Sequence, residues 1–200
     1  YFLSKKIDQK KTEIKKNFEV LIVSNIKKNE KKIRSIGFKT KNINFNRKSI
    51  NPLKEFICIL KFGLIIFNYK PDLIQSIALK PILYTSIISF FFRRPKLILC
   101  VVGLRYLFIN KDFLTKIIKN LYLFLIKVFL RKKGVRFVFQ NSSDKKIIEN
   151  YKISSFRKKS LISGSGVDTN KFVKVSTNKI YDLIFHSRIL YDKGFVELIN

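Results

Sequence analysis

The chain has 200 residues, and 46% of them are hydrophobic, which is enough to bury the core of one domain and part of another. Its formal net charge of +29 excludes an electrically neutral surface and is typical of proteins that bind nucleic acid or an anionic membrane. The abundance of Lys, Ile, Asn and Phe along the whole chain is also what an AT-rich coding sequence produces. The charge therefore does not choose between these explanations.

Cysteine and histidine are too few for a disulfide framework or a metal site. Cys58 and Cys100 both lie in apolar runs, which predicts buried thiols in a reducing, cytoplasmic compartment. His186 is the single histidine, and at a strand end we expect it to be structural. No apolar run reaches the roughly 18 residues that span a bilayer, because Arg93 closes the longest one, residues 81–92. We expect no membrane-spanning helix.

Helices and strands are predicted to alternate along the first 163 residues. The spacing of apolar residues predicts helices at 1–17, 26–37, 51–69, from 81 onward, 112–131 and 142–151. Asn51 is the predicted cap of the third of these, and Ser142 or Ser143 is the predicted cap of the last. Short apolar or alternating runs predict strands at 18–25, 38–45, 72–77, 96–102 and 135–140, and residues 158–163 are predicted as a last strand. Strict alternation indicates a parallel sheet covered by helices, which is the doubly wound, Rossmann-like α/β fold.

The composition of the sequence changes after Ser163. Residues 164–180 are polar, contain glycine and show no apolar period, which predicts a linker. Residues 181–200 then predict a strand followed by a helix, the beginning of a second Rossmann-like domain. The predicted organisation is one domain over residues 1–163, a linker, and the start of another domain.

Three loops lie where ligands bind in such sheets, at the carboxyl ends of strands. Gly103 ends a predicted strand and permits close approach of a ligand to the backbone, although a simple turn has the same signature. Residues 164–172 open no long helix and so do not form a dinucleotide-binding fingerprint, and taken alone they predict a flexible hinge. Arg188 and Lys193 flank a predicted strand-to-helix turn, where two cations suit a diphosphate and solvated charges are the plainer explanation.

Read in order, these loops resemble a known enzyme family. The segments are "NPLKEF", "PDLIQSIALKPILYTSI", "VVGLRYLF", "RFVFQNSSDKKII", "ISGSGVDTNKF" and "LIFHSRILYDKGF". Together they resemble the retaining glycosyltransferases of family 4, which have the GT-B fold, and within it the bacterial enzymes of capsule, O-antigen and exopolysaccharide synthesis. The resemblance extends over almost the whole chain.

The resemblance implies two Rossmann-like domains that face a cleft, with a glycan or lipid-linked acceptor on the first and a nucleotide-sugar on the second. Arg188 and Lys193 match the family's contacts to the donor diphosphate, and Gly103 and Leu104 match its acceptor-side loop. No metal and no resident cofactor are implied, and no catalytic residue is assigned.

The interdomain hinge implied by the resemblance is formed by Gly164, Gly166 and Asp168. Three positions depart from the family pattern: Val102 stands where many members have His, Arg105 where relatives tend to have a second Gly, and Ser187 where Gly usually precedes the donor Arg. The resemblance also implies a first strand and most of a donor domain, with its E-x7-E motif, beyond these 200 residues. We therefore expect no sugar transfer by the 200-residue chain alone.

The segment 111–134 leaves two interpretations open. It is apolar nearly all round and carries Lys116, Lys119 and Lys127, so it is either a buried core helix or a basic surface that docks on the inner face of the plasma membrane. A non-enzymatic protein that binds membrane or nucleic acid, and an inactive truncated gene product, are the rival hypotheses. Specific nucleic-acid binding is not expected, because no recognised reading module is present.

Overall fold

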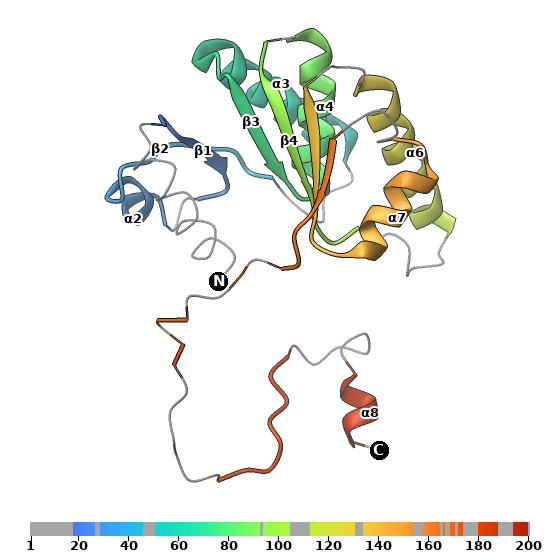
Figure 1. The fold of residues 1–200 in the computed structure, drawn as a ribbon. Helices are drawn as coiled ribbons and strands as arrows, with labels where there is room; N and C mark the ends of the chain where they lie inside the picture. Colours follow the sequence, from blue (N-terminus) through green and yellow to red (C-terminus); the bar gives the residue numbers. More distant parts are fainter. Residues whose placement is uncertain are drawn as a thin grey trace. The chain divides into compact units, whose positions relative to one another are not determined.

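The computed structural model describes residues 18–26, 29–45, 51–92, 94–104, 113–130, 134–153, 158–164, 166, 169–170, 172–173, 180–187 and 194–199. The chain divides into two compact units, Tyr1–Gly166 and Val167–Asn200 (Figure 1). The predicted helix at 1–17 lies outside the described residues, as do Asp168, Arg188 and Lys193.

The described part of the first unit contains two parallel sheets. Their strands are β1 (Leu21–Ser24), β2 (Lys39–Asn42), β3 (Leu73–Ile77), β4 (Lys96–Val101), β5 (Val135–Phe139) and β6 (Lys158–Leu161). β1 pairs with β2, and the other four strands form one sheet in the order β3-β4-β5-β6. Each strand lies inside a segment predicted as strand, so the prediction of a Rossmann-like α/β fold is confirmed.

Helices follow the strands, and asparagine side chains cap the starts of two of them. The helices of this unit are α2 (Glu30–Arg34), α3 (Pro52–Tyr69), α4 (Leu79–Phe91), α6 (Phe113–Phe129) and α7 (Ser142–Asn150). Asn51 caps α3 as predicted, because its Oδ1 accepts hydrogen bonds from the Leu53 and Lys54 amides at 3.0 and 3.2 Å. The prediction that Ser142 or Ser143 caps α7 is wrong. Asn141 does so, since its backbone is extended whereas Ser142 is already helical.

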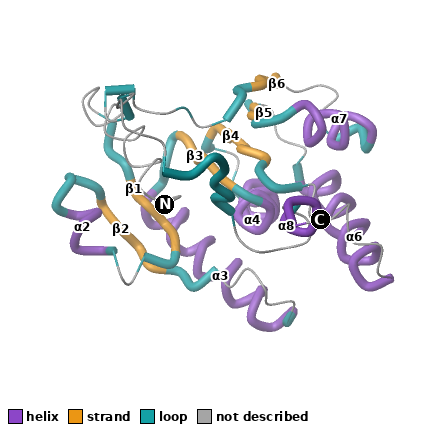
Figure 2. The backbone as a smooth tube through the Cα atoms, turned by 90° about the horizontal axis from the view of Figure 1, so that it is seen from below, coloured by secondary structure: helices purple, strands orange, loops and turns teal. Residues whose placement is uncertain are grey.

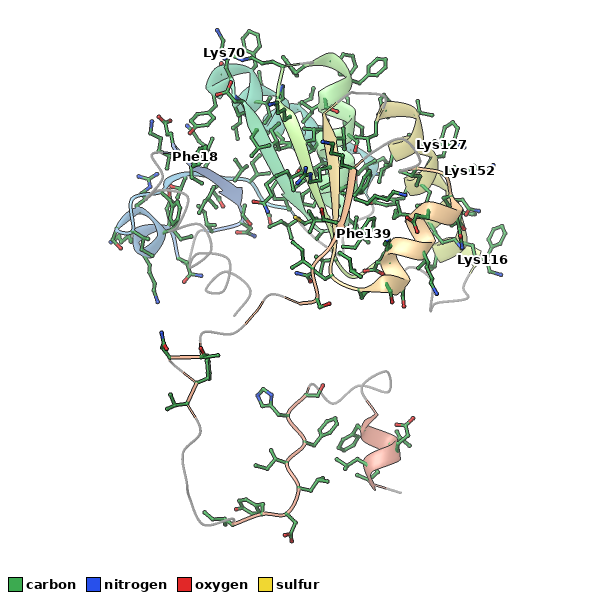
Figure 3. The ribbon with its side chains drawn as sticks, viewed as in Figure 1. Phe18, Lys70, Lys116, Lys127, Phe139 and Lys152 are labelled. Carbon is green, nitrogen blue, oxygen red and sulfur yellow. The ribbon has the colours of Figure 1, made fainter. Side chains whose placement is uncertain are left out.

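The main core lies between the four-stranded sheet and its helices. Alternate residues of β4 and β5 face the helices and are buried, and the register places Leu99 beside Phe137 and Val101 beside Phe139. The rings of Phe137 and Phe139 are stacked, with centroids 6.0 Å apart. Each fully buried side chain of this size contributes about 1.5–3 kcal/mol by leaving water. These two strands therefore form the centre of the fold, and Figure 3 labels Phe139 there.

α6 has one buried face and one exposed face. Tyr122, Leu123 and Ile126 are buried against the core, whereas Leu121 and Phe124 on the opposite face are exposed. The sequence predicts either a buried core helix or a surface helix for this segment. In the structure, one side of α6 is buried and the other side is exposed. No helix in the described part of the chain is long and apolar enough to cross a membrane.

β1 and β3 each have one edge without a partner strand among the described residues. In a parallel ladder, the backbone groups of successive residues point alternately toward and away from the partner strand. The hydrogen bonds at the two ends of each ladder show which residues point toward the partner. By that alternation, the backbone groups of Leu21 and Val23 point away from β2, and those of Leu73, Gln75 and Ile77 point away from β4. The additional strand that the resemblance implies stays a prediction.

A surface ion pair between α7 and β6 makes stability depend on pH. Lys159 Nζ donates a hydrogen bond of 2.8 Å to Glu149 Oε1, which holds the pKa of this carboxyl below its ordinary value of 4.5. A lowered folded-state pKa stabilises the fold above the unfolded pKa, and this contribution is lost as pH falls through the folded pKa. We expect Glu149→Gln to be less stable than the parent at neutral pH, with the difference closing below the ordinary carboxyl pKa. Urea midpoints measured across a pH series test this, and a difference that stays constant into acid contradicts it.

In the second unit the described residues contain one short helix, α8 (Phe195–Ile199). The rings of Phe185 and Phe195 lie 5.7 Å apart, so residues 180–187 contact the start of α8. The predicted helix therefore forms. Residues 181–187, predicted as strand, are not in a ladder, because a strand requires a hydrogen-bonded neighbour and the described residues of this unit include none.

Candidate functional site

The candidate site is the carboxyl edge of the four-stranded sheet. The strands are parallel and in register, so the loops after β3, β4, β5 and β6 all leave the sheet at this edge (Figure 2). These loops begin at Ala78, Val102, Gln140 and Ile162. Ligands of doubly wound folds bind at this edge of the sheet.

The loop after β4 contains the predicted acceptor-side residues. Gly103 has φ +76°, is exposed, and has no atom within 4 Å of where a Cβ would lie. Leu104 is fully buried in the main core. The two residues therefore have different environments: Gly103 has an exposed backbone without a side chain, whereas Leu104 anchors the loop in the core.

Ala78, at the end of β3, has a backbone conformation that normally requires glycine. Its φ of 76° and ψ of 168° lie in a region that side chains rarely adopt, and this costs about 1–3 kcal/mol. Its carbonyl accepts the first hydrogen bond of α4 from Ile82, and its amide donates to Cys100. Such strain concentrates at ligand sites. The sequence contains no signal for it, because alanine ordinarily predicts a helix.

We expect Ala78→Gly to stabilise the protein by about 1 kcal/mol. Glycine removes the side-chain strain, and this gain exceeds the roughly 0.5–1 kcal/mol that its extra freedom costs on folding. Urea denaturation measures the difference, with Ala78→Val as the matched substitution that should destabilise. A loss of stability in the glycine variant contradicts the strained geometry.

A half-buried polar cluster joins the first turns of α3 and α4. Lys80 Nζ forms an ion pair of 2.7 Å with Glu55 Oε1, and the Tyr84 hydroxyl donates to the other oxygen of the same carboxylate. From α6, the Tyr122 hydroxyl donates to the Leu79 carbonyl at 3.1 Å, and burial raises the pKa of this phenol. The cluster fixes how two helix amino ends are placed at the edge. Sequence reasoning missed it, because its members are far apart in the chain.

The loop after β5 places a buried carboxylate at the start of α7. Asn141 Oδ1 accepts from the Asp144 amide at 2.7 Å, and Asn141 Nδ2 donates to Asp144 Oδ2 at 3.0 Å. The side chain of Asp144 is fully buried, and its Oδ1 has no hydrogen-bond partner among the described residues. A negative charge in the first turn of a helix is favourable, so this carboxylate stabilises α7.

The predicted hinge glycines, Gly164 and Gly166, both have left-handed backbone conformations, with φ values of +71° and +70°. Apart from their chain neighbours, no atom of the described residues lies within 4 Å of where a Cβ would be at either glycine. The boundary between the two compact units falls at Gly166. That these glycines form an interdomain hinge stays a prediction. Asp168, Arg188 and Lys193 lie outside the described residues, so their assignments stay predictions.

A cleft of about 720 Å³ lies elsewhere, between the amino-terminal ends of β1 and β2 and the last turns of α3. Two of its cations are already paired, Arg34 with Glu30 at 2.6 Å and Lys39 with Glu19 at 2.7 Å. Burial, with a smaller effect of the nearby Glu19 carboxylate, raises the pKa of the lining Tyr69 to about 12. We place the candidate site at the carboxyl edge instead, because that is where parallel sheets of this type bind ligands.

The described residues contain no group of three His, Cys, Asp or Glu side chains that could hold a metal ion. Comparison with protein-family models finds no match, and comparison with curated proteins finds none either.

Proposed function

We propose that this chain belongs to a glycosyltransferase that moves a sugar from a nucleotide-sugar to a glycan or lipid-linked acceptor in surface polysaccharide synthesis, with retention of configuration. One observation carries the proposal. Three of the segments on which the family resemblance rests, around Gly103, Asn141 and Gly164, leave neighbouring strands at the same edge of the sheet. A shared edge is what a common substrate cleft requires.

In this proposal the first unit contributes the acceptor side. Gly103 offers exposed backbone, so an acceptor hydroxyl can approach without meeting a side chain. The cluster of Glu55, Lys80 and Tyr84 fixes the first turn of α3 against the start of α4. Rigid support matters, because transfer depends on holding the reacting atoms within a few tenths of an ångström of their productive positions.

Arg188 and Lys193 contribute the donor side. Two cations beside the diphosphate stabilise the negative charge that develops on the nucleotide as the bond to the sugar breaks. The acceptor hydroxyl attacks from the face that the nucleotide leaves, which retains the anomeric configuration. The cations perform the role that a divalent ion has in metal-dependent transferases.

A donor screen tests the proposal. The enzyme with its complete donor domain is incubated with a panel of nucleotide-sugars and a lipid extract containing acceptors, and release of nucleoside diphosphate is followed. We expect one nucleotide class to give release that depends on the acceptor. The absence of release with every donor, from protein that is folded by circular dichroism, contradicts the proposed activity.

A further inference from the structure

Three adjacent helices of the first unit expose large apolar side chains. These are Leu53, Phe56, Ile57, Leu60, Leu64 and Phe67 on α3, Phe90 and Phe91 on α4, and Phe113, Ile117, Leu121 and Phe124 on α6, which we call the apolar face. Their exposed fractions range from 43% to 80%. Contiguous apolar surface of this extent is rare on soluble monomers and marks an interaction site.

The exposed residues form stripes that run along the helices. On α3 and α6 they recur every three or four positions, which places them on one side of each helix. The opposite side of each helix is buried, with Phe62 and Ile66 on α3 and Tyr122 and Ile126 on α6. Both helices are therefore apolar on two sides, and only one side is used by the core.

Aromatic contacts join the three helices into one surface. Phe67 lies 6.1 Å from Phe92, and Phe90 lies 5.7 Å from Phe129, measured between ring centroids. These pairs connect the last turns of α3 and α6 to the end of α4. Figure 2 shows the three helices as one layer on the same side of β3 and β4. The exposed stripes consequently belong to a continuous face.

The charges on these helices are almost all positive. α3, α4 and α6 contain one carboxylate, that of Glu55, and it is bound by Lys80 and Tyr84. Lys54 and Lys61 flank the stripe of α3, and both are exposed. Lys116 and Lys127 flank the stripe of α6 and point away from the sheet in Figure 3. The apolar face is thus bordered by cations that no carboxylate of these helices neutralises.

We propose that the apolar face docks on the surface of an anionic membrane, with the helices lying in the plane of the interface. Aliphatic and aromatic side chains enter the boundary between headgroups and acyl chains, while the flanking lysines contact lipid phosphates. A second copy of the chain fits poorly, because pairing two such faces brings like charges together. Nucleic acid explains the lysines but gives the exposed leucine and isoleucine side chains no partner. The inference stands independently of sugar transfer, since docking requires no donor.

Vesicle binding of the full chain tests the proposal. We expect co-sedimentation with vesicles of phosphatidylcholine containing about a third phosphatidylglycerol, and little with pure phosphatidylcholine, because each lysine near an anionic surface adds about fivefold to affinity. The triple variant Lys61→Gln, Lys116→Gln and Lys127→Gln should bind at least about tenfold more weakly. The control removes three charges elsewhere, with Lys41→Gln, Lys96→Gln and Lys158→Gln, and should bind as the parent does.

The apolar contribution is tested separately. Leu60→Ser with Leu64→Ser should lower vesicle affinity at least about tenfold, because two buried leucines are lost from the interface. Leu161→Ser with Ile162→Ser, equally exposed but outside the apolar face, is the matched control. All four residues are exposed, so circular dichroism should show the parent fold in both variants.

Three results overturn the proposal. Equal weakening by both lysine triples shows that net charge alone drives binding. A dimer in light scattering that Leu60→Ser with Leu64→Ser converts to monomer, without vesicle binding by the parent, shows that the face is covered by a second copy. Displacement of the chain from anionic vesicles by equimolar single-stranded RNA shows that nucleic acid is the better ligand.

Discussion

Lys193→Ala, in the enzyme with its complete donor domain, should lower kcat/KM for the nucleotide-sugar at least about 100-fold. A cation that interacts with negative charge only as it develops on the departing nucleotide stabilises mainly the transition state. Removing such a group lowers the rate about 10²–10³-fold. Arg188→Ala should have an effect of the same size. Arg188→Lys should recover only part of the loss, because lysine cannot form the two parallel hydrogen bonds of a guanidinium with a diphosphate.

The control for this prediction is Lys41→Ala, which removes the same charge from β2 in the first unit. Its kinetics should equal those of the parent, because general electrostatic attraction of a nucleotide to a protein of net charge +29 changes little with one cation. Steady-state kinetics with varied donor separate the two cases. An unchanged kcat/KM in Lys193→Ala shows that Lys193 is not part of the donor site.

Phe139→Ala should destabilise the first unit by about 3–5 kcal/mol, the cost of removing a large aromatic side chain from a packed core. Phe139 is fully buried, stacks on Phe137 and lies beside Val101 and Leu161 in the sheet. It also precedes the loop that contains Asn141, so the candidate edge should lose its geometry together with the core. Urea denaturation at neutral pH measures the loss.

The matched variant is Phe91→Ala at the end of α4, where the ring is 69% exposed. Its free energy of unfolding should stay within about 0.5 kcal/mol of the parent, because little apolar surface leaves the core. A similar loss in both variants contradicts the placement of the core between the four-stranded sheet and its helices.

Much of this fold is predictable because its signals are local. Each strand lies inside its predicted segment, and β1, β4 and β5 are short apolar runs that contain β-branched or aromatic residues. The division into two sheets is not predictable in this way, since pairing depends on which strands meet in space. The segment 181–187 illustrates the same limit: its composition is that of a strand, but the described residues provide no neighbour for it.

The candidate edge was partly predictable for a similar reason. Gly103 and Gly164 follow predicted strands, and glycine at a strand end is a local signal of a left-handed turn. Ala78 adopts the same kind of backbone without any such signal. Glu55 and Lys80 meet across 25 residues of chain, and only the packing of α3 against α4 brings them together.

The anomeric configuration of the transferred sugar tests the central proposal most directly. The complete enzyme is incubated with its donor and acceptor, and the product linkage is read from its proton–proton coupling by nuclear magnetic resonance. The proposal predicts the same anomeric configuration in the product as in the nucleotide-sugar. It also predicts that Lys193→Ala loses the ability to form this product. An inverted linkage, or no new linkage with any donor, contradicts it.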